Sequence, residues 1–193
     1  TLQVDLEHEV VRMEEHEDGV ELDARDLRSG KIRSLRAGFV VGCDGANSFV
    51  RKTAGLGLDD LEFDEPWLVV DATVEAPPTE LGLPPYPTQY CDPARPVTYV
   101  PVAGPYIRWE FMLLPGENRE EMLRPERVRE LIAEQVDPDR VEVIRSAVYD
   151  FHALVAKRWG TRRVFLAGDS AHQTPPFLGQ GMCAGIRDAA NLA

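Results

Sequence analysis

Apolar and polar residues alternate near the beginning of the chain, which is the pattern of strands with one buried face. Apolar residues stand at every second position in Leu2–Leu6 and again in Val20–Ala24, a period of two that is typical of half-buried strands. The pairs Asp18-Gly19 and Ser29-Gly30 favour turns next to these runs. The pattern predicts a β-meander over the first part of the chain.

A change of pattern follows the meander. The short apolar run Phe39–Val41 ends at Gly42, and Ser48–Gly55 has the pattern of a short helix closed by glycine. Trp67–Val70 predicts a buried strand. Further on, the sequence predicts a proline-rich connection over Pro77–Pro87 and a β-rich stretch over Val97–Leu114, broken at Gly104-Pro105. It then predicts a helix over Pro125–Val136, with Val128, Leu131, Ile132 and Val136 on one face, and another strand over Val141–Leu154.

The last part of the chain predicts a strand, a loop and a helix in close succession. Arg163–Ala167 is a compact apolar run, and a loop rich in proline and glycine follows it. The final segment then places apolar residues on one side of a helix, at Met182, Ile186, Ala189 and Ala190.

Composition excludes several classes of protein. The 193 residues suffice for one core, or one core and part of another. A net charge of −12 argues against binding to nucleic acid or to an anionic membrane, and we expect no membrane span because no apolar run approaches about 20 residues. Three scattered cysteines, Cys43, Cys91 and Cys183, favour reduced thiols and a cytoplasmic location. Neither His172 nor Cys183 has a ligand-like partner nearby, so we expect no metal site.

The two ends of the sequence are abrupt. The chain has no initiator Met, and it stops at Ala193 inside a helical pattern. We expect the sequence to be a fragment of a longer protein.

The loop after Arg163–Ala167 has the chemistry of a ligand site. Asp169 directly follows the strand, where a carboxylate can accept hydrogen bonds from the hydroxyls of a sugar or polyol. Gly179 and Gly181 permit a tight turn and a close approach of the backbone, and the N-terminus of the next helix suits a phosphate or a developing anion. Taken alone, such glycines more often only make a turn.

The whole string from Gly168 to Gly181, with Asp188–Leu192, resembles the GD motif of the class A flavoprotein monooxygenases, the para-hydroxybenzoate hydroxylase-like family. The resemblance implies that Asp169 binds the ribityl chain of FAD and that Pro176 walls the flavin ring. It also implies that the amides around Gly179, Gln180 and Gly181 lie near the pyrimidine end of the ring, where a helix N-terminus would stabilise the negative charge of reduced flavin.

An earlier segment, Cys43–Arg51, also follows a strand and opens a helix. By residue chemistry alone, the hydroxyl of Ser48 can cap the helix, and the guanidinium group of Arg51 has paired N–H donors that suit a phosphate. Taken by itself, Asp44-Gly45 is more often a turn. The segment resembles the DG motif of the same family. In that family the motif serves both FAD and the pyrophosphate of the nicotinamide donor, which implies such roles for Asp44, Gly45, Ser48 and Arg51.

The resemblance also implies the fold. It implies a mixed α/β protein holding part of a Rossmann-like FAD-binding domain of the glutathione-reductase type, with an inserted β-sheet substrate domain. We expect residues 1–57 and 158–193 to belong to the FAD-binding domain and residues 58–157 to form the substrate domain. The N-terminal Gly-x-Gly-x-x-Gly unit of the family is missing, so we expect the isolated chain to be inactive.

Three strings in the middle of the chain, Trp67–Asp71, Tyr90–Pro96 and Arg108–Glu117, resemble the 3-(3-hydroxyphenyl)propionate hydroxylase subgroup. The implied reaction is reduction of FAD by NADH or NADPH, formation of a flavin C4a-hydroperoxide with O2, and hydroxylation of a small phenolic substrate. A homodimer is left open, as are two alternatives. These are a non-catalytic module that binds flavin or another ligand, and another class A reaction such as epoxidation in secondary metabolism.

The sequence does not identify a catalytic base. His152 and Tyr149 are candidates, because each lies on the last strand-like stretch of the middle region and could face a substrate. An isolated histidine or tyrosine in such a place is more often a partly buried residue with its polar atoms satisfied. His172 lies within the GD motif, and we expect its role to be structural.

Overall fold

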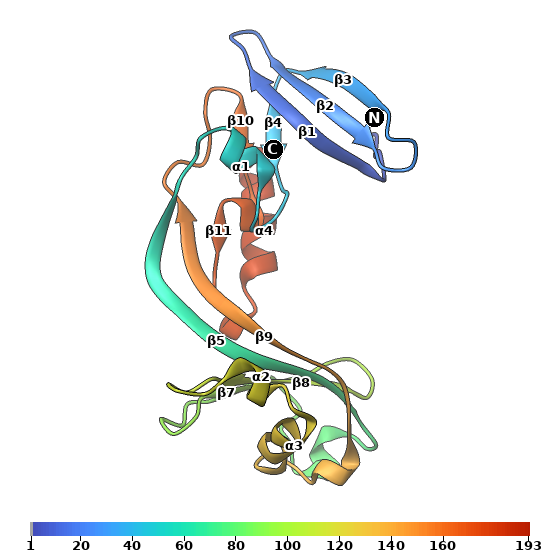
Figure 1. The fold of residues 1–193 in the computed structure, drawn as a ribbon, viewed down its shortest axis with the longest axis vertical. Helices are drawn as coiled ribbons and strands as arrows, with labels where there is room; N and C mark the ends of the chain where they lie inside the picture. The colour runs from blue at the N-terminus through green and yellow to red at the C-terminus, as the bar shows by residue number, and fades with distance from the viewer. Residues whose placement is uncertain (1) are drawn as a thin grey trace. The chain divides into compact units, whose positions relative to one another are not determined.

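The computed structural model describes residues 2–193, apart from the side chain of Leu178. The chain divides into two compact units. Unit 1 combines the part of the chain up to Glu62 with Ala153–Ala193, and unit 2 is Phe63–His152. The architecture is mixed α/β, with strands predominating (Figure 1).

Unit 1 begins with the predicted β-meander. Strands β1 (His8–Glu15), β2 (Val20–Asp26) and β3 (Ile32–Ala37) form an antiparallel sheet in the order β1-β2-β3. Val20 is fully buried and pairs with both Glu15 and Ala37. The turns predicted at Asp18-Gly19 and Ser29-Gly30 fall between these strands.

The strand predicted at Leu2–Leu6 is wrong. These residues adopt no strand, and Leu2, Val4 and Leu6 are between 68% and 90% exposed. The reason is the length of the neighbouring strand, because β2 ends at Asp26, which pairs with His8. Residues before His8 therefore have no strand to pair with, and apolar alternation alone does not form a ladder.

The rest of unit 1 is built around a parallel pair of short strands. Strand β4 (Val40–Gly42) pairs with β10 (Val164–Leu166), and helix α1 (Phe49–Thr53) follows β4. The core beneath the pair includes Met13, Val20, Val50, Leu56, Ala156, Val164, Leu166 and Ala171. After β10 come η3 (Gly168–Ser170), β11 (His172–Gln173), η4 (Pro176–Leu178) and helix α4 (Gly181–Leu192).

Helix α4 forms where the periodicity predicted it, but its apolar side is open. Met182 is 76% exposed and Ile186 is 61% exposed. Every residue of α4 is described, and none of them is buried. The helix therefore offers both its N-terminus and its apolar side to further groups.

Unit 2 contains most of a sheet with strand order β11-β9-β5-β8-β7-β6. Its strands β5 (Leu58–Val74) and β9 (Val141–Ala156) are long and run on into unit 1. The shorter strands are β6 (Thr88–Tyr90), β7 (Val97–Pro101) and β8 (Tyr106–Met112). The helical elements are η1 (Pro78–Leu81), α2 (Arg119–Met122), α3 (Pro125–Ala133) and η2 (Pro138–Arg140).

One face of the sheet in unit 2 forms the core. Val70 and Tyr99 both pair with Trp109, and all three side chains are buried on this face. The predicted helix packs here through Val128, Leu131 and Ile132. Since burying one large apolar side chain contributes about 1.5–3 kcal/mol, this cluster is a major source of the unit's stability. Because side chains alternate along a strand, the residues between these core positions point to the opposite face.

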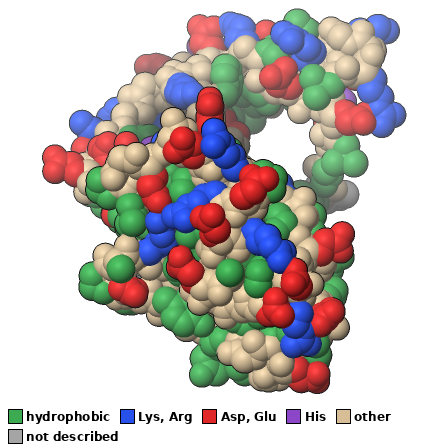
Figure 2. Space-filling model, turned by 60° about the horizontal axis from the view of Figure 1, so that its bottom comes forward, with side chains coloured by type: hydrophobic (Ala, Val, Ile, Leu, Met, Phe, Trp, Pro, Cys, Tyr) green, Lys and Arg blue, Asp and Glu red, His purple; other side chains and the backbone are tan. Residues whose placement is uncertain are grey.

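The surface mixes both signs of charge despite the excess of acids. Figure 2 shows acidic and basic side chains intermixed over the viewed face. Many arginines are paired with acids, as in the ion pairs of Arg140 with Glu75 and Arg129 with Asp139.

Candidate functional site

The DG segment forms a loop that its own side chains hold closed. Ser48 is fully buried, and it caps α1 by accepting a hydrogen bond from the backbone N–H of Arg51 at 2.9 Å. The hydroxyl of Ser48 also donates to Asp44, and the second oxygen of Asp44 accepts from the backbone N–H of Val50 at 3.0 Å. Gly45 has φ of 78°, a conformation that favours glycine.

These hydrogen bonds keep Asp44 ionised. Burial alone would raise the pKa of this carboxyl group, but the hydrogen bonds from Ser48 and from the backbone N–H of Val50 outweigh burial and lower the pKa below its ordinary value. The carboxylate therefore works as an acceptor that fixes the loop at the start of α1.

Arg51 joins the DG segment to the GD segment. Its side chain is buried, with only 5% of the residue exposed, and its terminal nitrogens donate to the backbone carbonyls of Ala46 at 2.8 Å and Ser170 at 2.9 Å. These bonds direct the guanidinium group to the protein backbone. A contact of Arg51 with a phosphate group remains a prediction.

The GD loop leaves the end of β10 in a tight turn. Gly168 has φ of 63°, and the hydroxyl of the fully buried Ser170 donates to the carbonyl of Gly42 at 2.6 Å, which ties the turn to the neighbouring strand β4. Asp169 lies between these two residues and is exposed. Within residues 2–193 its carboxylate has no hydrogen-bond partner, so it can accept bonds from a ligand.

Asp188 of α4 holds the turn from the other side. One of its oxygens accepts hydrogen bonds from the backbone N–H of Gly168 at 2.8 Å and from Nε2 of the buried His172 at 2.7 Å. The ring of His172 also packs against Trp159, with centroids 5.3 Å apart. The ring of His172 is thus held inside the protein by these two contacts, which agrees with the structural role expected for it.

A second glycine turn leads into α4. Gly179 ends η4 with φ of 60°, and the backbone then enters the helix at Gly181. No side chain at the N-cap position, Gln180, hydrogen-bonds to the first turn. A helix that begins without such a cap leaves N–H groups that can bind an anion or a polar ring edge.

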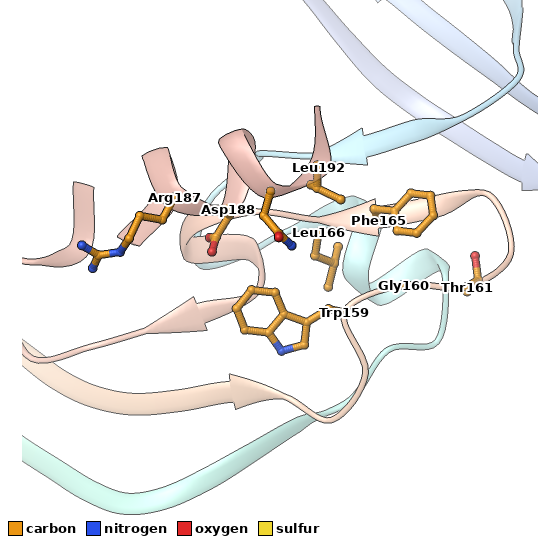
Figure 3. A pocket seen from close by; sticks show the side chains of 9 residues that line it. Trp159, Gly160, Thr161, Phe165, Leu166, Arg187, Asp188 and Leu192 are labelled. Atoms are coloured by element: carbon orange, nitrogen blue, oxygen red, sulfur yellow. The ribbon is translucent and has the colours of Figure 1, made fainter. Parts of the chain in front are cut away.

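A pocket of about 610 Å³ lies beside α4 but does not contain the predicted cofactor residues. Figure 3 shows Trp159 on one side of this space and Asp188 and Leu192 of α4 on the other. Of the residues that line this pocket, only Asp188 takes part in the hydrogen bonds that hold the GD loop.

The groups of the two motifs that are not engaged in hydrogen bonds within the protein fit a flavin dinucleotide. The structural polar groups, such as Ser48, Ser170 and Asp188, are engaged within the protein. Asp169 and the start of α4 present a free carboxylate and an uncapped helix N-terminus. This set matches a ligand with a polyol chain next to an electron-rich ring edge.

The two candidates for a catalytic base lie on β9 in unit 2. Tyr149 accepts a hydrogen bond from Arg145 at 3.1 Å, and its side chain is 41% exposed. His152 lies 3.5 Å from Asp64, with its ring also 41% exposed. Alternation along β9 places these two residues on opposite faces of the sheet, so they do not form one site. A catalytic role for either remains a prediction.

Sequence reasoning missed a polar cluster on the face of the sheet opposite the core. Asp71 on β5 binds Arg108 on β8 at 2.7 Å and Arg145 on β9 at 3.0 Å. Glu110, two positions after Arg108, lies on the same face and is buried. The signal was available, because Tyr106–Met112 is an apolar strand with two charged residues at every-second positions.

The FAD-binding domain family model matches residues 1–193. The chain belongs to this family. The prediction of a mixed α/β protein that binds FAD is therefore confirmed, together with its relationship to the flavoprotein hydroxylases. No helix in the described part of the chain is both long enough and apolar enough to cross a membrane.

Curated relatives include two kinds of aromatic hydroxylase. The chain is 44% identical over 178 residues to the "Probable NADH-specific resorcinol 4-hydroxylase" of Rhodococcus jostii (strain RHA1), covering 91% of this chain and 32% of that protein. It is 40% identical over 189 residues to a 3-(3-hydroxy-phenyl)propionate/3-hydroxycinnamic acid hydroxylase of Burkholderia cenocepacia (strain HI2424), covering 96% and 33%. The chain thus spans about a third of the length of these relatives.

Solved structures share the fold. Aklavinone-11 hydroxylase, in a ternary complex with FAD and aklavinone, matches with a TM-score of 0.82 and 27% identity over 96% of this chain and 36% of that one. The p-nitrophenol 4-monooxygenase of Pseudomonas putida DLL-E4 matches with a TM-score of 0.83 and 26% identity over 96% and 46%.

Proposed function

We propose that the protein containing this chain is an FAD-dependent hydroxylase of a small phenolic compound, driven by NADH or NADPH. The observation that carries the proposal is the pairing of β4 with β10, which brings the DG and GD loops together, with Arg51 hydrogen-bonded between them. Relatives that hydroxylate resorcinol or hydroxyphenylpropionate by name support the choice of substrate and, for one of them, NADH as donor.

We assign the contacts with the cofactor to groups of the two loops that the hydrogen bonds within the protein leave exposed. Asp169 would accept hydrogen bonds from the ribityl hydroxyls of FAD, and the backbone amides at Gly179–Gly181 would bind the pyrimidine edge of the ring, with Pro176 packed beside it. Asp44, Gly45, Ser48 and Arg51 would hold the second loop in place. When bound, the flavin supplies electron transfer from the nicotinamide and activation of O2; the protein orients the ring and excludes water.

We further assign residues 1–57 and 158–193 to the FAD-binding domain and residues 58–157 to the substrate domain. The separation of the chain into unit 1 and unit 2 supports this division. The sheet of unit 2 would then form the wall of the substrate site.

The test uses the full-length protein that contains this chain. We expect it to bind one FAD per chain, and to oxidise NADH or NADPH with formation of a hydroxylated product when 3-(3-hydroxyphenyl)propionate or resorcinol is added. Oxidation of the nicotinamide without a hydroxylated product would indicate an oxidase. A full-length protein that binds FAD but reacts with no phenol would indicate a non-catalytic binding module or another reaction, such as epoxidation.

A further inference from the structure

His172 joins strand β11 to helix α4. Only 7% of the residue is exposed, and its Nε2 atom donates a hydrogen bond to Asp188 of α4 at 2.7 Å. Burying a polar ring is unfavourable unless a hydrogen bond compensates for the lost contact with water. The bond to Asp188 therefore holds the ring in place, yet the contacts with the cofactor proposed above assign no task to this buried side chain.

The histidine side of this bond is fixed in position and orientation. The backbone of His172 pairs with Val155 of β9. The carbonyl of the preceding residue, Ala171, accepts a hydrogen bond from the backbone N–H of Ala156 at 2.7 Å. The indole of Trp159 packs against the imidazole ring, with centroids 5.3 Å apart. Nε2 of His172 is thus a fixed point to which α4 attaches.

Helix α4 makes two more contacts with the turn that follows β10. The oxygen of Asp188 that binds His172 also accepts from the backbone N–H of Gly168 at 2.8 Å. Gly185 brings the helix close to the same turn, because a Cβ atom added to Gly185 would lie 3.4 Å from the Cα atom of Gly168. Helix and turn are therefore in backbone contact, and the carboxylate of Asp188 ties both of them to His172.

These contacts lie on the same face of α4 as the beginning of the helix. Gly181, Gly185 and Asp188 have the spacing i, i+4, i+7, which places them on one side of a helix. Asp188 is roughly 10 Å from Gly181 along the helix axis, about two turns. A short straight helix moves as a unit, so a shift at Asp188 also displaces the N-terminus of α4.

The groups that we assign to the cofactor lie on both sides of this attachment. Asp169 directly follows Gly168 in the turn, and the backbone amides of Gly179–Gly181 lie where α4 begins. The separation of the carboxylate from these amides therefore depends on how α4 sits against the turn. A binding site needs such groups within about 0.5 Å of the productive geometry.

We propose that His172 is a positioning residue for FAD, and that it acts through Asp188 to set the separation between the carboxylate of Asp169 and the backbone amides at the start of α4. The proposal rests on the function proposed above. Because His172 is buried, it affects the cofactor only through Asp188, and its effect is on geometry as well as on stability.

Two polar substitutions in the full-length protein test the hydrogen bond. The side-chain nitrogen of glutamine extends about as far as Nε2 of histidine, whereas asparagine is one carbon shorter and does not reach Asp188. We expect His172→Gln to bind FAD within about three-fold of wild type, and His172→Asn to bind it about ten-fold more weakly, the effect of losing one good hydrogen bond. Quenching of flavin fluorescence measures both affinities. Equal affinity of the two variants would overturn the proposal.

The absorption spectrum of bound flavin separates positioning from stability. At saturating FAD and well below the unfolding temperature, a residue that only stabilises the fold leaves this spectrum unchanged. We expect the visible band to shift in His172→Asn and to keep its wild-type position in His172→Gln, because the amides of α4 meet the ring edge differently only in the first variant. A wild-type spectrum in folded, FAD-saturated His172→Asn would contradict the positioning role.

A control and a substitute variant complete the experiment. His8→Asn is the control, because His8 is exposed and lies on β1, outside the two loops; it should change neither affinity nor spectrum. If His172→Asn does not fold, Trp159→Leu replaces it. This change removes the ring that orients the imidazole at a side chain that is 42% exposed, and FAD affinity should fall about three-fold. Wild-type affinity in Trp159→Leu would then overturn the proposal.

Failure of this proposal is distinct from failure of the proposed function. A wild-type protein that binds FAD and hydroxylates phenols, with variants whose flavin affinity and spectrum match wild type, would contradict only the positioning role. A wild-type protein that binds no FAD would contradict the function, and the positioning role with it.

Discussion

The guanidinium of Arg51 donates a hydrogen bond to the backbone carbonyl of Ser170, 119 positions further along the chain. The same side chain binds the carbonyl of Ala46, and it has little contact with water. One buried cation therefore fixes the distance between the two loops to which we assign the cofactor.

Replacing this cation should destabilise the protein. In Arg51→Met the carbonyl of Ser170 loses the donor at 2.9 Å, and the carbonyl of Ala46 keeps only the longer bond from Gln173 at 3.3 Å. We expect the free energy of unfolding to fall by about 2–3 kcal/mol. Chemical denaturation of the full-length protein measures this change. Lys52→Met serves as the control, because Lys52 is an exposed residue of the same helix and should change stability by less than about 0.5 kcal/mol. Equal stability of the two variants would contradict the bridging role.

Asp169 should affect cofactor binding without affecting the fold. Its side chain is exposed and makes no hydrogen bond within the described residues, so Asp169→Asn should leave the unfolding free energy of the flavin-free protein within about 0.5 kcal/mol of wild type. We expect its affinity for FAD to fall about ten-fold or more, measured by quenching of flavin fluorescence. Glu142→Gln removes one exposed acid elsewhere and should bind FAD normally. Unchanged affinity in Asp169→Asn would remove this residue from the proposed site.

Asp188 should affect both the stability of the protein and its affinity for FAD. Asp188→Ala removes the shared acceptor of Gly168 and His172, and we expect a loss of about 2 kcal/mol in stability together with weaker FAD binding. Thermal unfolding and flavin titration measure the two effects. Arg187→Ala, at an exposed neighbour on α4, should show neither effect. A stable Asp188→Ala variant with normal flavin affinity would show that the turn holds its shape without this contact.

Glu117 should make unit 2 sensitive to acid. Hydrogen bonds from Arg95 lower the pKa of Glu117 to about 2, against the effect of burial and with help from Leu114 and Arg127. The ordinary pKa is 4.5, so the stabilisation is complete above pH 4.5 and disappears as the pH falls towards 2. Glu117→Gln should lack this part of the pH dependence and lose about 1–3 kcal/mol at neutral pH.

Urea denaturation between pH 2 and 7 tests the role of Glu117. The control is Glu130→Gln, because the Glu130 side chain is 65% exposed and its pair with Arg127 should contribute at most about 1 kcal/mol. If wild type and Glu117→Gln lose stability in parallel below pH 4.5, the acid sensitivity arises elsewhere.

The sequence predicted the local elements well because their signals are local. The helix cap at Ser48, the amphipathic helix at Pro125 and the turn at Gly179 each depend on residues a few positions apart. The error at Leu2–Leu6 has the opposite cause, since a strand needs a partner and alternation does not reveal its length.

The candidate site was predicted only in part. The motif strings identified Asp44 and Asp169, but not the hydrogen bond from His172 to Asp188 or the bridge made by Arg51. The cluster around Asp71 joins three strands, and its existence depends on register. Register is set by packing across the whole sheet, so charged residues on an apolar strand indicate only that a polar face exists.

The parallel pairing of β4 with β10 has a consequence for the order in which the chain acquires its structure. Unit 2 is one continuous segment, so its strands can find their neighbours as soon as they are synthesised. Strand β4 cannot pair until its partner β10, which ends at Leu166, has been synthesised. Joining two segments so far apart in the chain has an entropic cost, and this cost is lower when the segment between them is already compact. We therefore expect the inserted unit to fold first during synthesis, and the loops on either side of Arg51 to come together last.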